Sequence, residues 1–81
     1  MDVRVYGTGC PNCRRLEARA REALAAMGAA VAVTKVEDLG MIADAGVLRT
    51  PALGIDGSVV LQGRVPEVTE LAEIFAAALA R

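Results

Sequence analysis

The hydrophobic pattern of this chain changes period near the N-terminus, where a strand pattern passes within a few residues into a helix pattern. Residues 3–6 alternate and are rich in β-branched side chains, which predicts a short strand ending at Gly7. Beyond Arg14 the apolar residues follow the spacing of one helix face: Leu16, Ala20, Ala23, Leu24 and Met27. Since residues 31–36 predict a second strand, the three elements form a β-α-β unit with parallel strands and a right-handed crossover.

The rest of the chain predicts a short helix, a hairpin and a final helix. The elements are a helix to about residue 45, strands over residues 52–55 and 58–61, and a helix from about residue 67. Asp38 suits the N-cap of the short helix and Gly46 its end. Asp56 and Gly57 form a hairpin turn, which makes this strand pair antiparallel. We therefore expect an α/β fold, with a mixed four-stranded sheet, helices on its faces and the first strand in the centre.

Composition excludes several classes of function. The 81 residues contain nine Lys and Arg against ten Asp and Glu, a formal charge of −1, so a surface for nucleic acid is not expected. One Phe, one Tyr and no Trp leave no aromatic platform for bases. The absence of His excludes Cys-His catalysis and zinc sites that need imidazole. The length predicts one domain, residues 1–81, and its only thiols are Cys10 and Cys13.

The two cysteines stand where the first strand ends and the helix begins. Pro11 suits the first helical position, where its missing N–H costs nothing. If Cys10 is at the N-cap, the free N–H groups of Asn12 and Cys13 point toward its sulfur, and the helix dipole favours a thiolate. Cys13 lies one turn further and is expected to be more shielded. We therefore expect Cys10 to attack a target disulfide and Cys13 to resolve the mixed disulfide.

Two other interpretations of the pair stay open from the residues alone. A structural disulfide closing so short a ring would stabilise the fold by only about 2 kcal/mol, and a cytoplasmic setting keeps such thiols reduced. The run from Gly7 to Cys13 also resembles the metal loop of small copper- and mercury-binding domains, although Thr8 replaces the usual Met and residues 72–79 predict a helix where those domains have a strand. The alternative function is therefore a soft-metal (Cu, Zn or Hg) carrier, in which two chains share a metal through four thiolates.

Three segments together give the chain a family resemblance. Cys10-Pro11-Asn12-Cys13 after the first strand, Thr50-Pro51 at the start of the third, and residues 63–66 resemble the very small thioredoxin-like proteins, also called redox-active disulfide proteins, of the thioredoxin/glutaredoxin superfamily. The similarity spans nearly the whole chain. It implies a minimal thioredoxin fold, β-α-β-α-β-β-α, and a thiol–disulfide oxidoreductase that reduces protein disulfides and carries electrons.

The resemblance also implies roles for residues around the dithiol. Pro51 would follow a cis peptide bond beside the cysteines and expose the backbone of Thr50 to an extended target peptide, although its position alone would permit an ordinary strand-starting proline. Arg49 either lines this groove or projects into water. The active-site loop would contain Thr8, Gly9, Pro11 and Asn12. The dithiol needs no bound cofactor, and the implied partners are disulfide-bearing proteins and a flavin-dependent thioredoxin reductase.

The chain departs from its larger relatives at two places. Lys35 occupies a strand position resembling that of a buried lysine in thioredoxins, but Arg4 stands where the partner Asp would lie. The usual proton acceptor for Cys13 is therefore missing. Residues 64–67 read Arg-Val-Pro-Glu and not the Gly-Asp pair with which glutaredoxins hold glutathione. Protein disulfides are consequently the favoured substrates.

The N-terminal segment and the apolar runs bear on localisation. Residues 1–4 contain no basic segment that leads into an apolar core, so no signal peptide is expected. The longest uncharged run, residues 23–34, is too short to cross a bilayer. We expect a cytoplasmic monomer with no membrane or nucleic-acid partner.

Overall fold

The computed structural model describes residues 1–80 and contains four strands and three helices. In chain order the elements are β1 (Val3–Tyr6), α1 (Pro11–Ala26), β2 (Val33–Val36), α2 (Leu39–Asp44), β3 (Ala52–Ile55), β4 (Ser58–Gln62) and α3 (Val68–Leu79). This is the predicted order. β2 begins later than predicted because its ladder starts opposite Val3, the first residue of β1. β4 runs one residue further than predicted because Gln62 still pairs with Ala52.

The sheet is mixed, and its strands lie in the order β2-β1-β3-β4. β1 pairs in parallel with β2 and antiparallel with β3, and β3 pairs antiparallel with β4. Asp56 and Gly57 turn the β3–β4 hairpin with positive φ angles of 51° and 86°, as the Asp-Gly signal predicts. β1 is thus an interior strand, as expected, and it carries the chain to the cysteines from the middle of the sheet.

The helix ends follow the local sequence. The Asp38 side chain caps α2 by accepting the Met41 N–H at 2.9 Å. Gly28 follows α1 with a φ of 70°, and its N–H bonds the Ala25 carbonyl at 3.0 Å, which is the left-handed C-terminal end expected from a glycine there. None of the helices within residues 1–80 combines the length and the hydrophobicity that a membrane span requires.

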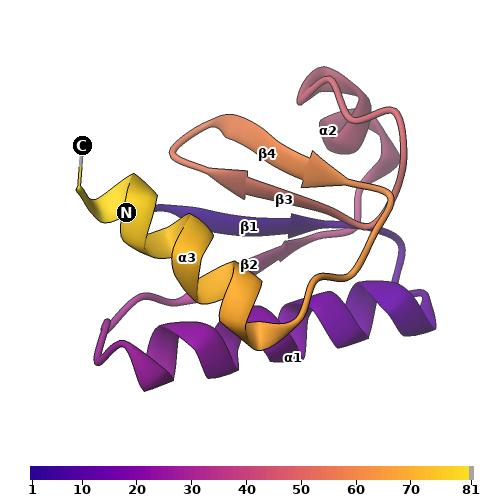
Figure 1. Cartoon of the computed structure of the whole chain (residues 1–81). Coiled ribbons are helices and arrows are strands. Elements are labelled where there is room, and N and C mark those ends of the chain that lie inside the picture. Colours follow the sequence, from indigo (N-terminus) through magenta and orange to yellow (C-terminus); the bar gives the residue numbers. More distant parts are fainter. Residues whose placement is uncertain (81) are drawn as a thin grey trace.

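The two faces of the sheet are covered unequally (Figure 1). α1 and α3 lie together on one face, where their apolar side chains pack with Val3 and Val5 in the main core. On the other face, Ile42 of α2 packs with Tyr6 in a smaller cluster. Side chains alternate between the two faces along β1, which explains this division. Val3 and Val5 point toward the main core, and Arg4 and Tyr6 point to the opposite face. The β1–α1 loop and the start of β3 meet at one end of the sheet.

Candidate functional site

Cys10 is the N-cap of α1, and its sulfur takes the place of the oxygen of a Ser or Asp cap. Its backbone is extended (φ −66°, ψ 162°) and Pro11 is the first helical residue. The Cys13 N–H donates to Cys10 Sγ at 3.1 Å. The sequence predicts that the N–H groups of Asn12 and Cys13 face this sulfur, and the Cys13 N–H is the one that makes the hydrogen bond. This bond and the positive end of the helix dipole both favour negative charge on Cys10 Sγ.

Cys13 lies one turn further along α1 and forms a disulfide with Cys10, with the two Cα atoms 5.0 Å apart. The two residues differ in their exposure. Cys10 is partly exposed, whereas Cys13 has only 5% of its surface accessible. A partner that approaches from solvent therefore meets Cys10 first, and Cys13 is the shielded cysteine that the sequence predicted.

Gly7, at the end of β1, leaves the room that Cys13 needs. A Cβ atom at this position would overlap Cys13 Sγ, and it would lie 3.1 Å from Cys13 Cβ and 3.9 Å from Thr50 Cβ. The end of β1, the first turn of α1 and the segment before β3 therefore meet at one glycine. Sequence reasoning assigned Gly7 only to a loop and missed this contact.

The remaining loop residues surround Cys10 at the surface. Gly9 has a φ of 83°, a conformation that favours glycine. The fully exposed members of the loop are Thr8, Pro11 and Asn12. Asn12 Oδ1 accepts a hydrogen bond from Arg15 Nη1 at 2.9 Å. This bond holds a guanidinium over the first turn of α1.

Thr50 lies beside the end of β1, where a Cβ at Gly7 would be 3.9 Å from Thr50 Cβ, and Arg49 and Pro51 adjoin it in the chain. The Thr50–Pro51 peptide bond is cis. Thr50 is exposed and Pro51 is buried, and the Pro51 carbonyl accepts the Gly63 N–H at 2.8 Å. Arg49 is exposed but does not simply project into water, because its stem lies over Gly63: a Cβ there would be 3.0 Å from Arg49 Cδ.

Gln62, the last residue of β4, fixes this segment from the neighbouring strand. Its Oε1 atom accepts the backbone N–H groups of Leu48 at 2.7 Å and Arg49 at 3.0 Å. Both donors directly precede Thr50 and Pro51. The Leu48 side chain remains 89% exposed, so the contact orders the backbone and leaves the side chain free. Sequence reasoning missed Gln62, because no local motif links it to a loop that lies 13 and 14 residues earlier.

Comparisons with known proteins identify the family to which this site belongs. A family model described as a thioredoxin domain matches residues 1–76. The chain belongs to the thioredoxin family. It is 38% identical over 74 residues to a thioredoxin of Methanothermobacter thermautotrophicus, an alignment that covers 91% of this chain and 96% of that protein. It is 34% identical over 71 residues to a thioredoxin of Methanocaldococcus jannaschii, with coverage of 88% and 81%.

Membership of the thioredoxin family, together with the Cys10–Cys13 disulfide, makes this chain a thiol–disulfide oxidoreductase. The soft-metal alternative is not favoured. The chain's last element is the helix α3, as predicted, where the metal-binding domains of similar length have a strand. Within the described residues 1–80, no three His, Cys, Asp or Glu side chains form a group that could hold a metal ion.

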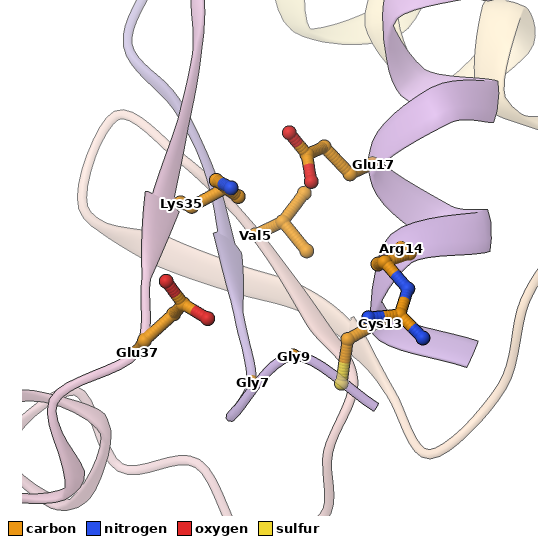
Figure 2. A pocket seen from close by; sticks show the side chains of 8 residues that line it. All are labelled: Val5, Gly7, Gly9, Cys13, Arg14, Glu17, Lys35 and Glu37. Carbon is orange, nitrogen blue, oxygen red and sulfur yellow. The ribbon is translucent and has the colours of Figure 1, made fainter. Parts of the chain in front are cut away.

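On its inner side Cys13 lines a pocket of about 100 Å³ between α1 and the sheet (Figure 2). We call it the Cys13 pocket; its lining residues are Val5, Gly7, Gly9, Cys13, Arg14, Glu17, Lys35 and Glu37. Lys35, expected to resemble a buried lysine, is in fact exposed, because β2 is an edge strand. Its side chain nevertheless turns toward α1 and Glu17.

The strand position expected to supply a proton acceptor does not face the Cys13 pocket. Arg4 lies on the opposite face of the sheet and pairs with Asp2 at 3.1 Å, while Val5 lines the pocket. The carboxylates that line the Cys13 pocket come instead from α1, as Glu17, and from the residue after β2, as Glu37. Sequence reasoning missed Glu17, although its spacing of four residues from Cys13 placed it on the same helix face.

One ion pair, which lies outside the site, shifts the pKa values of both of its members. Arg64 donates to both carboxylate oxygens of Glu70, at 3.1 and 2.6 Å. This hydrogen bonding holds the pKa of Glu70 below its ordinary value and raises the pKa of Arg64. The pair joins the segment after β4 to the first turn of α3, so Arg64 is engaged away from the cysteines.

Proposed function

We propose that this chain reduces disulfide bonds in partner proteins and so acts as a small carrier of two electrons. The observation that carries the proposal is the hydrogen bond from the Cys13 N–H to Cys10 Sγ, at 3.1 Å, on a cysteine that is partly exposed. A thiolate at such a helix start has a pKa below the ordinary cysteine value of about 8.5. Cys10 is thereby supported as the nucleophile and the shielded Cys13 as the resolving thiol.

The reaction proceeds in two exchanges. The Cys10 thiolate attacks one sulfur of the target disulfide, forming a mixed disulfide and releasing the other target sulfur as a thiolate, which takes up a proton. Cys13, once deprotonated, attacks Cys10 Sγ; the Cys10–Cys13 bond forms and the second target thiolate leaves. The target gains two electrons and the dithiol loses two, which leaves the protein in the disulfide state of this structure.

The target peptide is proposed to bind across Arg49, Thr50 and Pro51. Thr50 lies close to Gly7, which lies against Cys13, and Gln62 holds the backbone before Thr50 in place. Thr50 is exposed, so its backbone is available to pair with an extended peptide. The loop residues Thr8, Gly9, Pro11 and Asn12 form the opposite wall, next to the attacking sulfur.

The physiological setting follows from this chemistry. Since the dithiol carries the electrons itself, we propose that the protein needs no bound cofactor and is recharged by a flavin-dependent thioredoxin reductase. The family membership supports disulfide-bearing proteins and a reductase as the general classes of partner. We further propose a single domain, residues 1–81, that acts as a monomer in the cytoplasm.

The test is insulin reduction by dithiothreitol, followed through precipitation of the insulin B chain. The wild-type protein is expected to accelerate the reaction, and Cys10→Ser to abolish the acceleration. Cys13→Ser, the matched variant, is expected to form a stable mixed disulfide through Cys10 and to turn over very slowly. Full activity in Cys10→Ser would refute the assignment. Absence of turnover in the wild-type protein, with tight binding of one Cu(I) by two chains, would instead favour the metal carrier.

A further inference from the structure

The resolving step poses a problem that the dithiol alone does not solve. Cys13 must lose its proton before it can attack Cys10, yet it is 5% exposed, and no carboxylate from β1 faces it. Within residues 1–80, Glu17 is the buried charged side chain, with 8% of the residue exposed. Its carboxylate is used neither by the disulfide nor by the proposed target groove.

Glu17 and Cys13 share one face of α1 and one pocket. They are four residues apart, so their side chains lie one above the other on the inward face of the helix. Both line the Cys13 pocket, whose volume of about 100 Å³ is enough for several water molecules. In Figure 2 the Glu17 carboxylate extends from α1 over Val5 toward Lys35, above the Cys13 sulfur in the view. Glu17 and Cys13 therefore border the same pocket, which is large enough to admit water.

Positively charged side chains lie around Glu17. Arg21, one turn further along α1, forms an ion pair with the Glu17 carboxylate. Lys35 of β2 also faces the pocket, as does Arg14 from the first turn of α1. The other acidic group is Glu37, which is exposed and lies against the loop at Gly9. Three cations thus surround two carboxylates, and Glu17 is the carboxylate that the protein buries.

We propose that Glu17 is the proton acceptor for Cys13, an inference that rests on the proposed function. The Cys13 Sγ–H bond breaks and its proton passes across the Cys13 pocket to a Glu17 carboxylate oxygen. The resulting thiolate attacks Cys10 Sγ of the mixed disulfide. The Cys10–Cys13 bond forms, and the target sulfur leaves with the electron pair and takes a proton from solvent. Glu17 then returns its proton to solvent through the pocket.

The test isolates this step with Ellman's reagent, 5,5′-dithiobis(2-nitrobenzoate), in a stopped-flow instrument. Reduced protein releases one nitrothiobenzoate when Cys10 attacks and a second when Cys13 resolves, and the second phase is first-order. In the wild-type protein we expect the rate of this second phase to stay level from mildly acidic to neutral pH, because Glu17 accepts the proton of the Cys13 thiol. In Glu17→Gln we expect a rate proportional to hydroxide concentration, about 100-fold slower near neutrality.

A second measurement separates proton transfer from loss of structure. In the Cys10→Ser background, Glu17→Gln removes a negative charge from the Cys13 pocket, so the Cys13 thiol is expected to titrate at a lower pH. Resolution should therefore slow even though the thiolate becomes easier to form, a combination that mere loosening of the fold does not give. A Cys13 titration that stays in place, or a level resolution rate in Glu17→Gln, would overturn the proposal.

Three single variants complete the design. Glu22→Gln changes an exposed carboxylate of the same helix and is expected to leave both phases unchanged. Arg21→Gln removes the ion pair but keeps the Glu17 carboxylate, so the level rate should persist. If the resolution rate becomes proportional to hydroxide concentration in Arg21→Gln or in Glu37→Gln, although Glu17 is intact, another group is the proton acceptor and the proposal is overturned. The assay needs no protein substrate, so failure of insulin reduction and failure of this inference are distinguishable.

Discussion

The two sides of the disulfide are built by different means. Cys10 faces solvent, and the start of a helix stabilises its sulfur through the Cys13 N–H and the helix dipole. Cys13 faces inward, and packing surrounds it: Gly7 lies against its sulfur, and Glu17 shares its pocket. The attacking thiol thus depends on backbone geometry that any sequence with a helix start supplies. The resolving thiol depends on particular residues, a glycine that leaves room for its sulfur and a glutamate in its pocket.

The largest effect is expected on the inward side of the disulfide, where a substitution at Gly7 should lower the stability of the protein. Gly7→Ala introduces a methyl group that overlaps Cys13 Sγ, and overpacking of this kind costs about 1–3 kcal/mol in the free energy of unfolding. The disulfide fixes the Cys13 sulfur, whereas the reduced side chain can rotate away. Denaturant unfolding should therefore show a greater loss of stability in the oxidised protein than in the reduced one.

Gly28→Ala is the matched control for this substitution. Gly28 also has a demanding backbone conformation, with a φ of 70°, but a Cβ there meets nothing within 4 Å. Its cost, about 1 kcal/mol from the left-handed backbone, should be the same in both redox states. An equal loss in both states of Gly7→Ala would contradict the contact with Cys13.

A smaller effect is expected on the outward side. Gln62→Met removes the acceptor of the Leu48 and Arg49 N–H groups, and each such bond is worth about 1 kcal/mol. We expect kcat/KM for insulin reduction to fall by about 5- to 30-fold. The reaction of Cys10 with Ellman's reagent, which does not use the peptide groove, should keep its rate.

The conservative substitution Gln62→Glu sharpens this prediction, because a carboxylate still accepts both N–H groups. It should restore most of the kcat/KM that Gln62→Met loses. If both substitutions leave kcat/KM at the wild-type value, Gln62 has no part in holding the segment that leads to Pro51. If both slow the reaction of Cys10 with the small reagent, the two sides of the disulfide are not independent.

The features that the sequence predicted correctly are those set by neighbouring residues. Asp56-Gly57 specifies a hairpin turn because both positions tolerate positive φ, and Gly28 ends α1 for the same reason. Cys10 before Pro11 predicts an N-cap sulfur, and the structure places the Cys13 N–H on it. The family pattern, carried by the two cysteines and Thr50-Pro51, extended these local signals to the whole fold.

The features that the sequence did not reveal depend on contacts between distant segments. Gly7 is a loop residue in the sequence, and its closeness to Cys13 arises only when α1 packs on β1. The resemblance to thioredoxins places the proton acceptor on the first strand, at the position that Arg4 occupies here. Alternation along β1 turns that position to the opposite face and leaves Val5 in the pocket, so the nearby buried carboxylate belongs to the helix.

The central claim, that Cys10 is the activated thiol and Cys13 the shielded one, is tested most directly by thiol titration. The alkylation rate of the single remaining cysteine in Cys13→Ser and in Cys10→Ser is measured across pH. Cys10 is predicted to titrate below the ordinary value of about 8.5 and to react faster than Cys13 at neutral pH. If Cys10 titrated near 8.5 and Cys13 reacted faster, the assignment of the two roles would be contradicted.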